Sequence, residues 1–162
     1  KGYEDVHREM GENLKKAQRL KDELLDLLQK DTEAFNDAAQ AFKMPKTSEE
    51  EKKARVEAIE RGLVKASEVP LAVMEKSLEI SRLARKVLAK GNKMAITDGA
   101  ISALFAEAAA IGGMINVRIN FSWMKNREYI EKTEKRLGEI LQEARAIREE
   151  AVASTLKQLG QA

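Results

Sequence analysis

The sequence contains no cysteine among its 162 residues. This absence excludes disulfide bonds, thiolate metal sites and a cysteine nucleophile, and it fits a protein of a reducing compartment, so we expect a cytoplasmic location. Long apolar runs are also missing. The longest stretch without a charged residue, Ala108 to Val117, falls well short of the roughly 20 residues that a membrane span needs. No signal peptide opens the sequence, and we therefore expect no membrane segment.

Histidine is almost absent as well, with His7 alone in the chain. Glu4 and His7 have the Glu-x-x-His spacing of a carboxylate-bridged di-iron site, but that site takes two such motifs. We therefore interpret His7 as an ordinary helix residue, and we expect no metal and no prosthetic group. Ser154 and Lys157 have the spacing of serine–lysine acylases without any companion motif, which makes a chance match the better interpretation.

Charge and composition favour a single helical domain over residues 1–162. Lysine and arginine number 29 against 27 acidic residues, and the two signs are interspersed, which is not typical of a nucleic-acid-binding surface. Only two prolines occur, and apolar residues recur at helical spacing with little strand-like alternation. The sequence predicts an all-α antiparallel bundle of about five long helices.

The first two helices are expected over residues 3–29 and 32–43, with Asp31 as the N-cap of the second. Pro45 then disfavours helix at the residue before it. Ser48 followed by Glu51 has the pattern of a capping box and opens a third helix. Pro70 should kink or break that helix, because proline lacks a backbone donor and clashes with the preceding turn.

Gly91 is expected to end the segment after Pro70, and Thr97 or Asp98 to cap the next helix. The last helix is expected over residues 128–159, with a seam of apolar or small residues that ends at Ser154 and has the alternating spacing of a coiled coil. We expect the longest helices at the two ends of the chain.

The stretch "AAAIGGMINVRINF", residues 108–121, stands out. Asn116 and Asn120 are four positions apart and therefore share one helix face, whereas Arg118 points nearly the opposite way. Two interpretations remain open. The amides either line a binding site or hydrogen-bond across a close helix contact that Gly112 and Gly113 permit.

Several blocks of the sequence resemble successive blocks of one known family. These are "DTEAFNDAAQAFKMPKTSEEEKKAR", "ASEVPLAV", "KGN" and "ITDGAISALFAEAAAIGGMINVRINF". In this order they closely resemble the formiminotransferase-cyclodeaminase C-terminal family, over nearly the whole chain. Members of that family begin with a further helix and a glycine-rich turn associated with the folate site, and this sequence contains nothing like that turn.

The resemblance implies a homodimer that acts on a tetrahydrofolate derivative as substrate. The leading function is formimidoyltetrahydrofolate cyclodeaminase, which closes the 5-formimino compound to 5,10-methenyltetrahydrofolate and releases ammonia. Methenyltetrahydrofolate cyclohydrolase is the enzymatic alternative. The missing glycine-rich turn favours a third interpretation, a helical interaction module without catalysis.

Within this family chemistry, Asp98 is our candidate for proton transfer to the leaving nitrogen, with a helix cap as the competing role. Asn116 and Asn120 are candidates for binding the donor and acceptor edge of the pterin. Asp31 is expected to be a cap, not a catalyst. Arg118 is expected to form a salt bridge or a subunit contact, and Met114, Trp123 and Met124 to be core or interface residues.

Overall fold

The computed structural model describes residues 2–160, and within them the chain is helical, with no strand. Four long helices and two short 3-10 turns follow one another: η1 (Glu4–Val6), α1 (His7–Lys43), α2 (Glu49–Lys90), η2 (Lys93–Ala95), α3 (Ile96–Phe121) and α4 (Arg127–Gln158). The predicted all-α class is confirmed. The predicted number of five long helices is wrong, because the first two are one.

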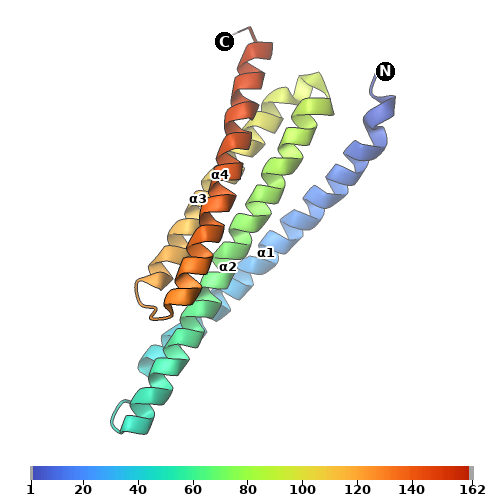
Figure 1. Ribbon diagram of the computed structural model, residues 1–162. Helices are drawn as coiled ribbons and strands as arrows, with labels where there is room; N and C mark the ends of the chain where they lie inside the picture. Colours follow the sequence, from blue (N-terminus) through green and yellow to red (C-terminus); the bar gives the residue numbers. More distant parts are fainter. Residues whose placement is uncertain (1, 161–162) are drawn as a thin grey trace.

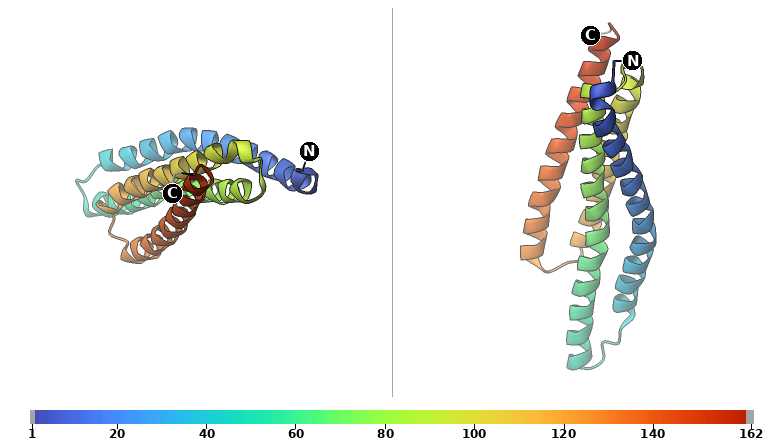
Figure 2. Two further views of the ribbon diagram at one scale, coloured as in Figure 1. Left: turned by 90° about the horizontal axis from the view of Figure 1, so that it is seen from above. Right: turned by 90° about the vertical axis from the view of Figure 1, so that its right-hand side faces the viewer.

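The four helices form an elongated antiparallel bundle with both chain ends at the same end (Figure 1). α2 packs against each of the other three helices, and α3 also packs against α4. The hairpin of α1 and α2 extends beyond the loop between α3 and α4 (Figures 1 and 2). The N-terminal half of α1 diverges from α3 and α4 but stays joined to α2 by ion pairs such as Lys90 with Glu9. α2 is thus the central element of the bundle.

α1 passes without interruption through Asp31, which was expected to cap a new helix. The hydroxyl of Thr32 donates to the carbonyl of Leu28 at 3.2 Å, one turn back in the same helix. The hydroxyl is therefore satisfied inside the helix and does not open a second one. The predicted end of the first helix near Gln29 and the predicted cap at Asp31 are both wrong.

α2 begins as predicted with a capping box, in which Ser48 and Glu51 satisfy each other's backbone N–H groups. Pro70 lies inside this helix, so the predicted break there is wrong, whereas the alternative of a kink near Pro70 stays a prediction. With 42 residues α2 is the longest helix, so the longest helices are not at the chain ends. The helix ends as predicted, with Gly91 at its C-cap.

The start of α3 differs from the prediction that Thr97 or Asp98 caps it. Asn92 accepts a hydrogen bond from the backbone N–H of Met94 at 2.9 Å and opens η2, which runs directly into α3. The N-cap position of α3 itself is Ala95, which makes no side-chain cap bond. α4 agrees with the prediction within one residue at each end, although Thr155 is buried at the end of its seam, not Ser154.

The hydrophobic core lies between α2, α3 and α4. Its buried members are Met74, Leu78, Ala84, Ala103, Ala110, Val117, Leu137, Ile140, Ala144, Ile147 and Ala151. α3 contributes mostly alanine and valine to this core and presents larger apolar side chains to solvent. The segment Lys93–Phe121 is long and apolar enough to cross a membrane, with 33% of its most apolar part buried in the bundle. Buried helices of other proteins have this property too, so the absence of a membrane segment stays a prediction.

Candidate functional site

A groove of about 660 Å³ lies between α1 and α3, with α2 as its floor. Its α1 wall is formed by Asp31, Phe35, Ala38, Ala39, Phe42 and Lys43. Its floor is formed by Leu63, Ala66 and Pro70. Its α3 wall is formed by Asn116, Ile119 and Asn120, and Trp123 from the turn after α3 extends this wall. On each helix these positions recur every three or four residues and therefore share a face. The volume is within the usual range of small-molecule sites.

Asn120 reaches from the α3 wall to the floor of the groove. Its amide nitrogen Nδ2 donates to the carbonyl oxygen of Ala66 at 3.2 Å and to that of Asn116 at 3.0 Å. Pro70 has no backbone N–H, so the carbonyl four residues earlier, that of Ala66, has no partner within α2. Asn120 supplies this partner, which explains how α2 continues through its proline.

Gly113 makes this contact possible. A Cβ at Gly113 would lie 2.8 Å from the carbonyl oxygen of Pro70 and 2.6 Å from Cγ of Met74. Only glycine allows the backbones of α2 and α3 to approach this closely. The close-contact interpretation of the amide pair is therefore confirmed for Asn120. Gly112, by contrast, faces open space.

Asn116 is in a different position from Asn120. It is exposed, lines the groove and makes no side-chain hydrogen bond within residues 2–160. Its amide is thus free to donate to a ligand and to accept from it. The prediction that both amides face one cleft agrees with this geometry. The side chain of Asn116 keeps its full hydrogen-bonding capacity.

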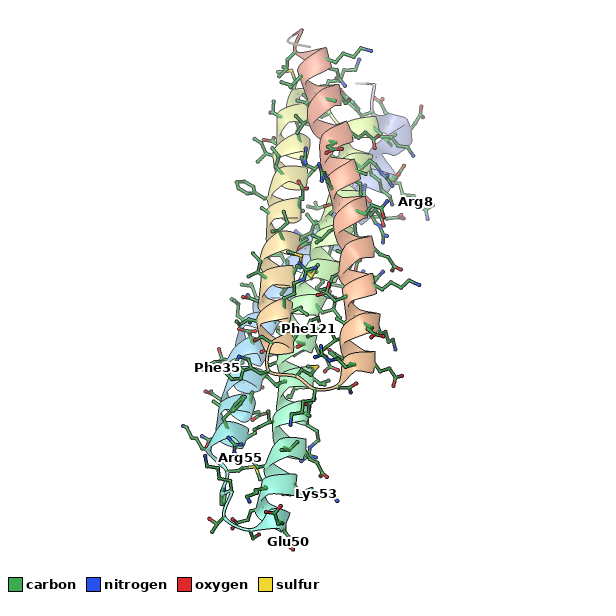
Figure 3. The ribbon with its side chains drawn as sticks, turned by 60° about the vertical axis from the view of Figure 1, so that its left-hand side comes forward. Arg8, Phe35, Glu50, Lys53, Arg55 and Phe121 are labelled. Carbon is green, nitrogen blue, oxygen red and sulfur yellow. The ribbon has the colours of Figure 1, made fainter. Side chains whose placement is uncertain are left out.

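Aromatic side chains close one end of the groove. The rings of Phe42 and Trp123 meet edge to face with centroids 6.2 Å apart, joining the α1 and α3 walls. Phe35 stands on α1 and is 69% exposed (Figure 3). Trp123 is also mostly exposed, whereas Met124 is buried in agreement with a core role. Exposed aromatic rings of this kind offer flat apolar faces to a ligand.

Two charged residues line the groove, Asp31 and Lys43. Neither has an ion-pair partner in the described part of the chain, whereas Asp37 on another face of α1 binds Lys65 at 2.6 Å. Asp31 was expected to be a helix cap, and no signal in the sequence singled out Lys43. The spacing of Asp31 and Lys43 from Phe35 and Phe42 places all four on one face of the helix. Only the packing of α1 on α2 shows that this face lines a groove.

Asp98 lies away from this groove. It is exposed in the first turn of α3, and its backbone carbonyl accepts a hydrogen bond from the hydroxyl of Ser102 at 2.7 Å. Asn116 follows 18 residues later on the same helix, a separation of about 27 Å at a rise of 1.5 Å per residue. Within one chain the structure does not bring Asp98 and the amide pair together.

The remaining polar residues near the groove support its walls. Arg118 forms a two-point salt bridge with Glu134 at 2.9 and 2.8 Å, as predicted, and this hydrogen-bonded carboxylate raises the pKa of Arg118. Glu60 accepts the backbone N–H groups of Lys125 and Asn126 and so fixes the loop after α3 to α2. Within residues 2–160 no three His, Asp or Glu side chains form a group that could hold a metal ion.

The sequence model of the formiminotransferase-cyclodeaminase family matches residues 1–139 of this chain. The chain belongs to this family. The resemblance seen in the sequence is confirmed, and the family assignment covers all the residues that form the groove. It also covers Asp98 and the start of α4.

Individual relatives carry two different names. A methenyltetrahydrofolate cyclohydrolase of Methylorubrum extorquens is 34% identical, over 92% of this chain and 72% of its own length. The formimidoyltransferase-cyclodeaminase of Gallus gallus is 31% identical over 76% of this chain, which spans only 23% of that larger protein. The crystal structure of a formiminotetrahydrofolate cyclodeaminase from Thermotoga maritima superposes with a TM-score of 0.74 at 29% identity, over 99% of this chain and 74% of that one.

Proposed function

We propose that the groove between α1 and α3 binds a tetrahydrofolate derivative and that the protein closes or opens the one-carbon bridge between N5 and N10. The observation that carries this proposal is a groove of about 660 Å³ that is lined both by the free amide of Asn116 and by exposed aromatic rings. A pterin needs such a combination of a polar edge and flat faces. Membership of a family whose named relatives act on tetrahydrofolate compounds supports it.

The finer activity that we propose is formimidoyltetrahydrofolate cyclodeamination. N10 attacks the formimino carbon on N5, and the proton that N10 loses goes to the imino nitrogen, which becomes an amino group on a tetrahedral carbon. This amino nitrogen gains one further proton, its bond to the carbon breaks, and it leaves as ammonia. The protein must hold N10 against the carbon and deliver this proton. The reaction needs no prosthetic group. The names of the Gallus gallus relative and of the Thermotoga maritima structure support this choice.

The second candidate is methenyltetrahydrofolate cyclohydrolase. Here water adds to the methenyl carbon, and the ring opens to 10-formyltetrahydrofolate. The specific support is the Methylorubrum extorquens relative, which matches 92% of this chain at 34% identity. Both reactions pass through a tetrahedral carbon between N5 and N10, so the same groove serves either of them.

We further propose that the protein is a homodimer paired through α3. One side of α3 exposes Ile101, Phe105, Ile115 and Ile119, at 47, 72, 58 and 61%. The open space at Gly112 lies within this row and would let a second helix approach closely. A two-fold axis perpendicular to α3 would bury the same row on both subunits, and the two α3 helices would then run antiparallel.

This pairing gives Asp98 a place in the proposed site. When two antiparallel copies of α3 cross at residue 110, the midpoint of this exposed row, residue 98 of one copy lies level with residue 122 of the other, at the end of α3. Asp98 would then approach the groove of the partner subunit and could deliver the proton to the leaving nitrogen. Asn116 and Asn120 would hold the pterin in the same groove.

The activity is tested with the complete gene product in single turnovers, read by the absorbance of methenyltetrahydrofolate. The formimino substrate and 10-formyltetrahydrofolate are supplied in parallel. Faster conversion of the first identifies a deaminase, and faster conversion of the second a cyclohydrolase running in reverse. Asn116→Leu should reduce binding, whereas Asp37→Asn, outside the groove, should not. A protein that binds neither compound would be a non-catalytic module.

The dimer is tested by light scattering at micromolar concentration. Ile115→Glu should give the mass of one chain and Leu159→Glu should not; association of wild-type protein with lipid vesicles in place of dimers would contradict the proposal.

Two inactive variants, Asp98→Asn and Asn116→Leu, are then mixed. If each site uses both subunits, the mixture regains about a quarter of wild-type activity, because half the dimers are mixed and each has one intact site. No recovery would remove Asp98 from the partner's site.

A further inference from the structure

The two charges of the groove lie at opposite ends of it. Ala38 contacts Gly62, since a Cβ on that glycine would be 2.9 Å from Cα of Ala38. α1 and α2 are antiparallel, so Asp31, two turns before Ala38, lies near Pro70, two turns after Gly62. Lys43 lies at the other end, about 18 Å away at 1.5 Å per residue.

The Asp31 end combines a carboxylate with a free amide. Gly113 packs against Pro70, and Asn116 follows one turn later on the same helix. Asp31 and Asn116 therefore face the same end of the groove from its two walls. A carboxylate accepts two parallel hydrogen bonds from adjacent N–H groups. The pyrimidine edge of a pterin carries such a pair of donors, its ring N–H and its 2-amino group.

The Lys43 end combines a cation with aromatic rings. Lys43 follows Phe42, whose ring meets Trp123 across the groove. An ammonium group is a point charge on a flexible stem, suited to a carboxylate whose position varies. The end of a folate opposite the pterin is an aromatic ring that carries a glutamate with two carboxylates.

We infer that the groove binds its substrate in one direction, with the pterin held by Asp31 and the glutamate tail by Lys43. This inference rests on the proposed function. N5, N10 and the one-carbon unit then lie between the two ends, beside Asn120. Its amide nitrogen is committed to Ala66 and Asn116, and its carbonyl oxygen remains available to the substrate. Asp31 is a binding residue in this arrangement, and it transfers no proton.

The test compares the binding of tetrahydrofolate with that of tetrahydropteroate, which lacks only the glutamate. Asp31→Asn should weaken the binding of both compounds by the same factor, roughly 10- to 150-fold, as expected for a lost charge-assisted hydrogen bond. Lys43→Met should weaken only tetrahydrofolate, roughly two- to fivefold, since a single solvated ion pair contributes little. The control variants are Asp37→Asn on another face of α1 and Lys46→Met in the loop after it.

Each outcome has a distinct meaning. If wild-type protein binds neither compound, the proposed function fails. If it binds both and Asp31→Asn and Lys43→Met behave like their controls, only the direction of binding is wrong. A Lys43→Met effect on tetrahydropteroate would place the pterin at the other end. A fall in kcat for Asp31→Asn without a change in Kd would make Asp31 the proton donor and overturn its assignment.

Discussion

α4 and α1 flank the central helix α2 and are attached to the bundle in different ways. α4 buries a seam at alternating steps of three and four residues, formed by Thr133, Leu137, Ile140, Ala144, Ile147, Ala151 and Thr155. α1 buries little more than every seventh residue, namely Asn13, Leu20, Leu27, Ala34 and Ala41, together with Ala38. The first pattern is the full contact surface of a coiled coil, and the second is about half of it.

The ion pairs follow the same division. The cations that bind α4 to its neighbours are arginines, and Arg82 holds both carboxylate oxygens of Glu143. The ion pairs between α1 and α2 use lysines, such as Lys16 with Glu79 and Lys90 with Glu9. Arg55 of α2 also contacts α1, but it donates to the backbone carbonyl of Phe42. A guanidinium fixes its partner by two bonds in a plane, whereas an ammonium makes a less directional contact.

The comparison shows how the groove is built. Its α3 wall belongs to the well-packed part of the molecule and is fixed on α2 through Gly113 and Asn120. Its α1 wall stands on a narrow contact with exposed apolar side chains beside it, including Leu28 and Phe35. We expect α3 to set the geometry of the site and α1 to adjust around the ligand.

The largest effect on stability should come from truncating one buried leucine in the contact of α4 and one in the contact of α1. Leu137 is fully buried in the α4 seam, and Leu27 is 8% exposed in the α1 stripe. Leu137→Ala should cost about 2–5 kcal/mol of unfolding free energy in urea, and Leu27→Ala an amount near the lower limit, because α1 can shift to fill the space. Equal losses would contradict the comparison.

Adding a methyl group at Gly113 tests the α3 wall. Its Cβ would meet the backbone carbonyl of Pro70, which cannot move aside without shifting α2. Gly113→Ala should therefore cost about 1–3 kcal/mol of stability and weaken ligand binding. Gly138→Ala is the control, because a Cβ there meets nothing within 4 Å, and it should gain up to about 1 kcal/mol. If Gly113→Ala stabilises the protein as Gly138→Ala does, the backbones of α2 and α3 do not approach each other this closely at Gly113.

Asn120 and Pro70 can be tested together as a pair. Asn120→Leu should cost about 1–3 kcal/mol, because it leaves the carbonyl of Ala66 without a partner. In a Pro70→Ala background the restored N–H supplies that partner, so the same change should cost much less. Asn116→Leu should lose ligand affinity with little stability in either background. If the loss at Asn120 is the same with and without Pro70, the carbonyl is not the reason for it.

Features that depend on nearby residues could be predicted from the sequence. The capping box at Ser48, the end of α2 before Gly91 and the bounds of α4 are local patterns, and each was predicted within a residue or so. The position of Arg118 opposite the asparagines predicted a salt bridge or a subunit contact, and the structure shows the salt bridge. Asp31 and Thr32 are residues that often begin a helix. α1 nevertheless continues through them, because its buried stripe extends on both sides of this point.

The groove could be predicted only in part. The shared face of Asn116 and Asn120 followed from helical spacing, and a proline with an unpaired carbonyl suggests that some polar side chain must approach it. The sequence does not show that this side chain comes from residue 120, 50 positions after Pro70. Nor does it show that α1 leaves a gap over α2 into which Asp31 and Lys43 face.

The smallest predicted effect concerns the arginine pairs of α4 and their dependence on pH. The hydrogen bonds from Arg82 lower the pKa of Glu143 below its ordinary value. The pair therefore stabilises the fold above the unfolded-state pKa of this carboxyl group, and the stabilisation is lost as the pH falls through the lower folded-state pKa.

Glu143→Gln should lower the unfolding free energy by less than about 1 kcal/mol at pH 7, because the pair is partly solvated. The difference from wild type should disappear on acidification, in denaturant titrations at a series of pH values. Glu131→Gln, at an exposed position on α4 without an ion pair in residues 2–160, is the matched control. A Glu143 effect that persists in acid would mean that packing, not charge, holds this edge of α4 to α2, and the distinction between arginine and lysine contacts would lose its basis.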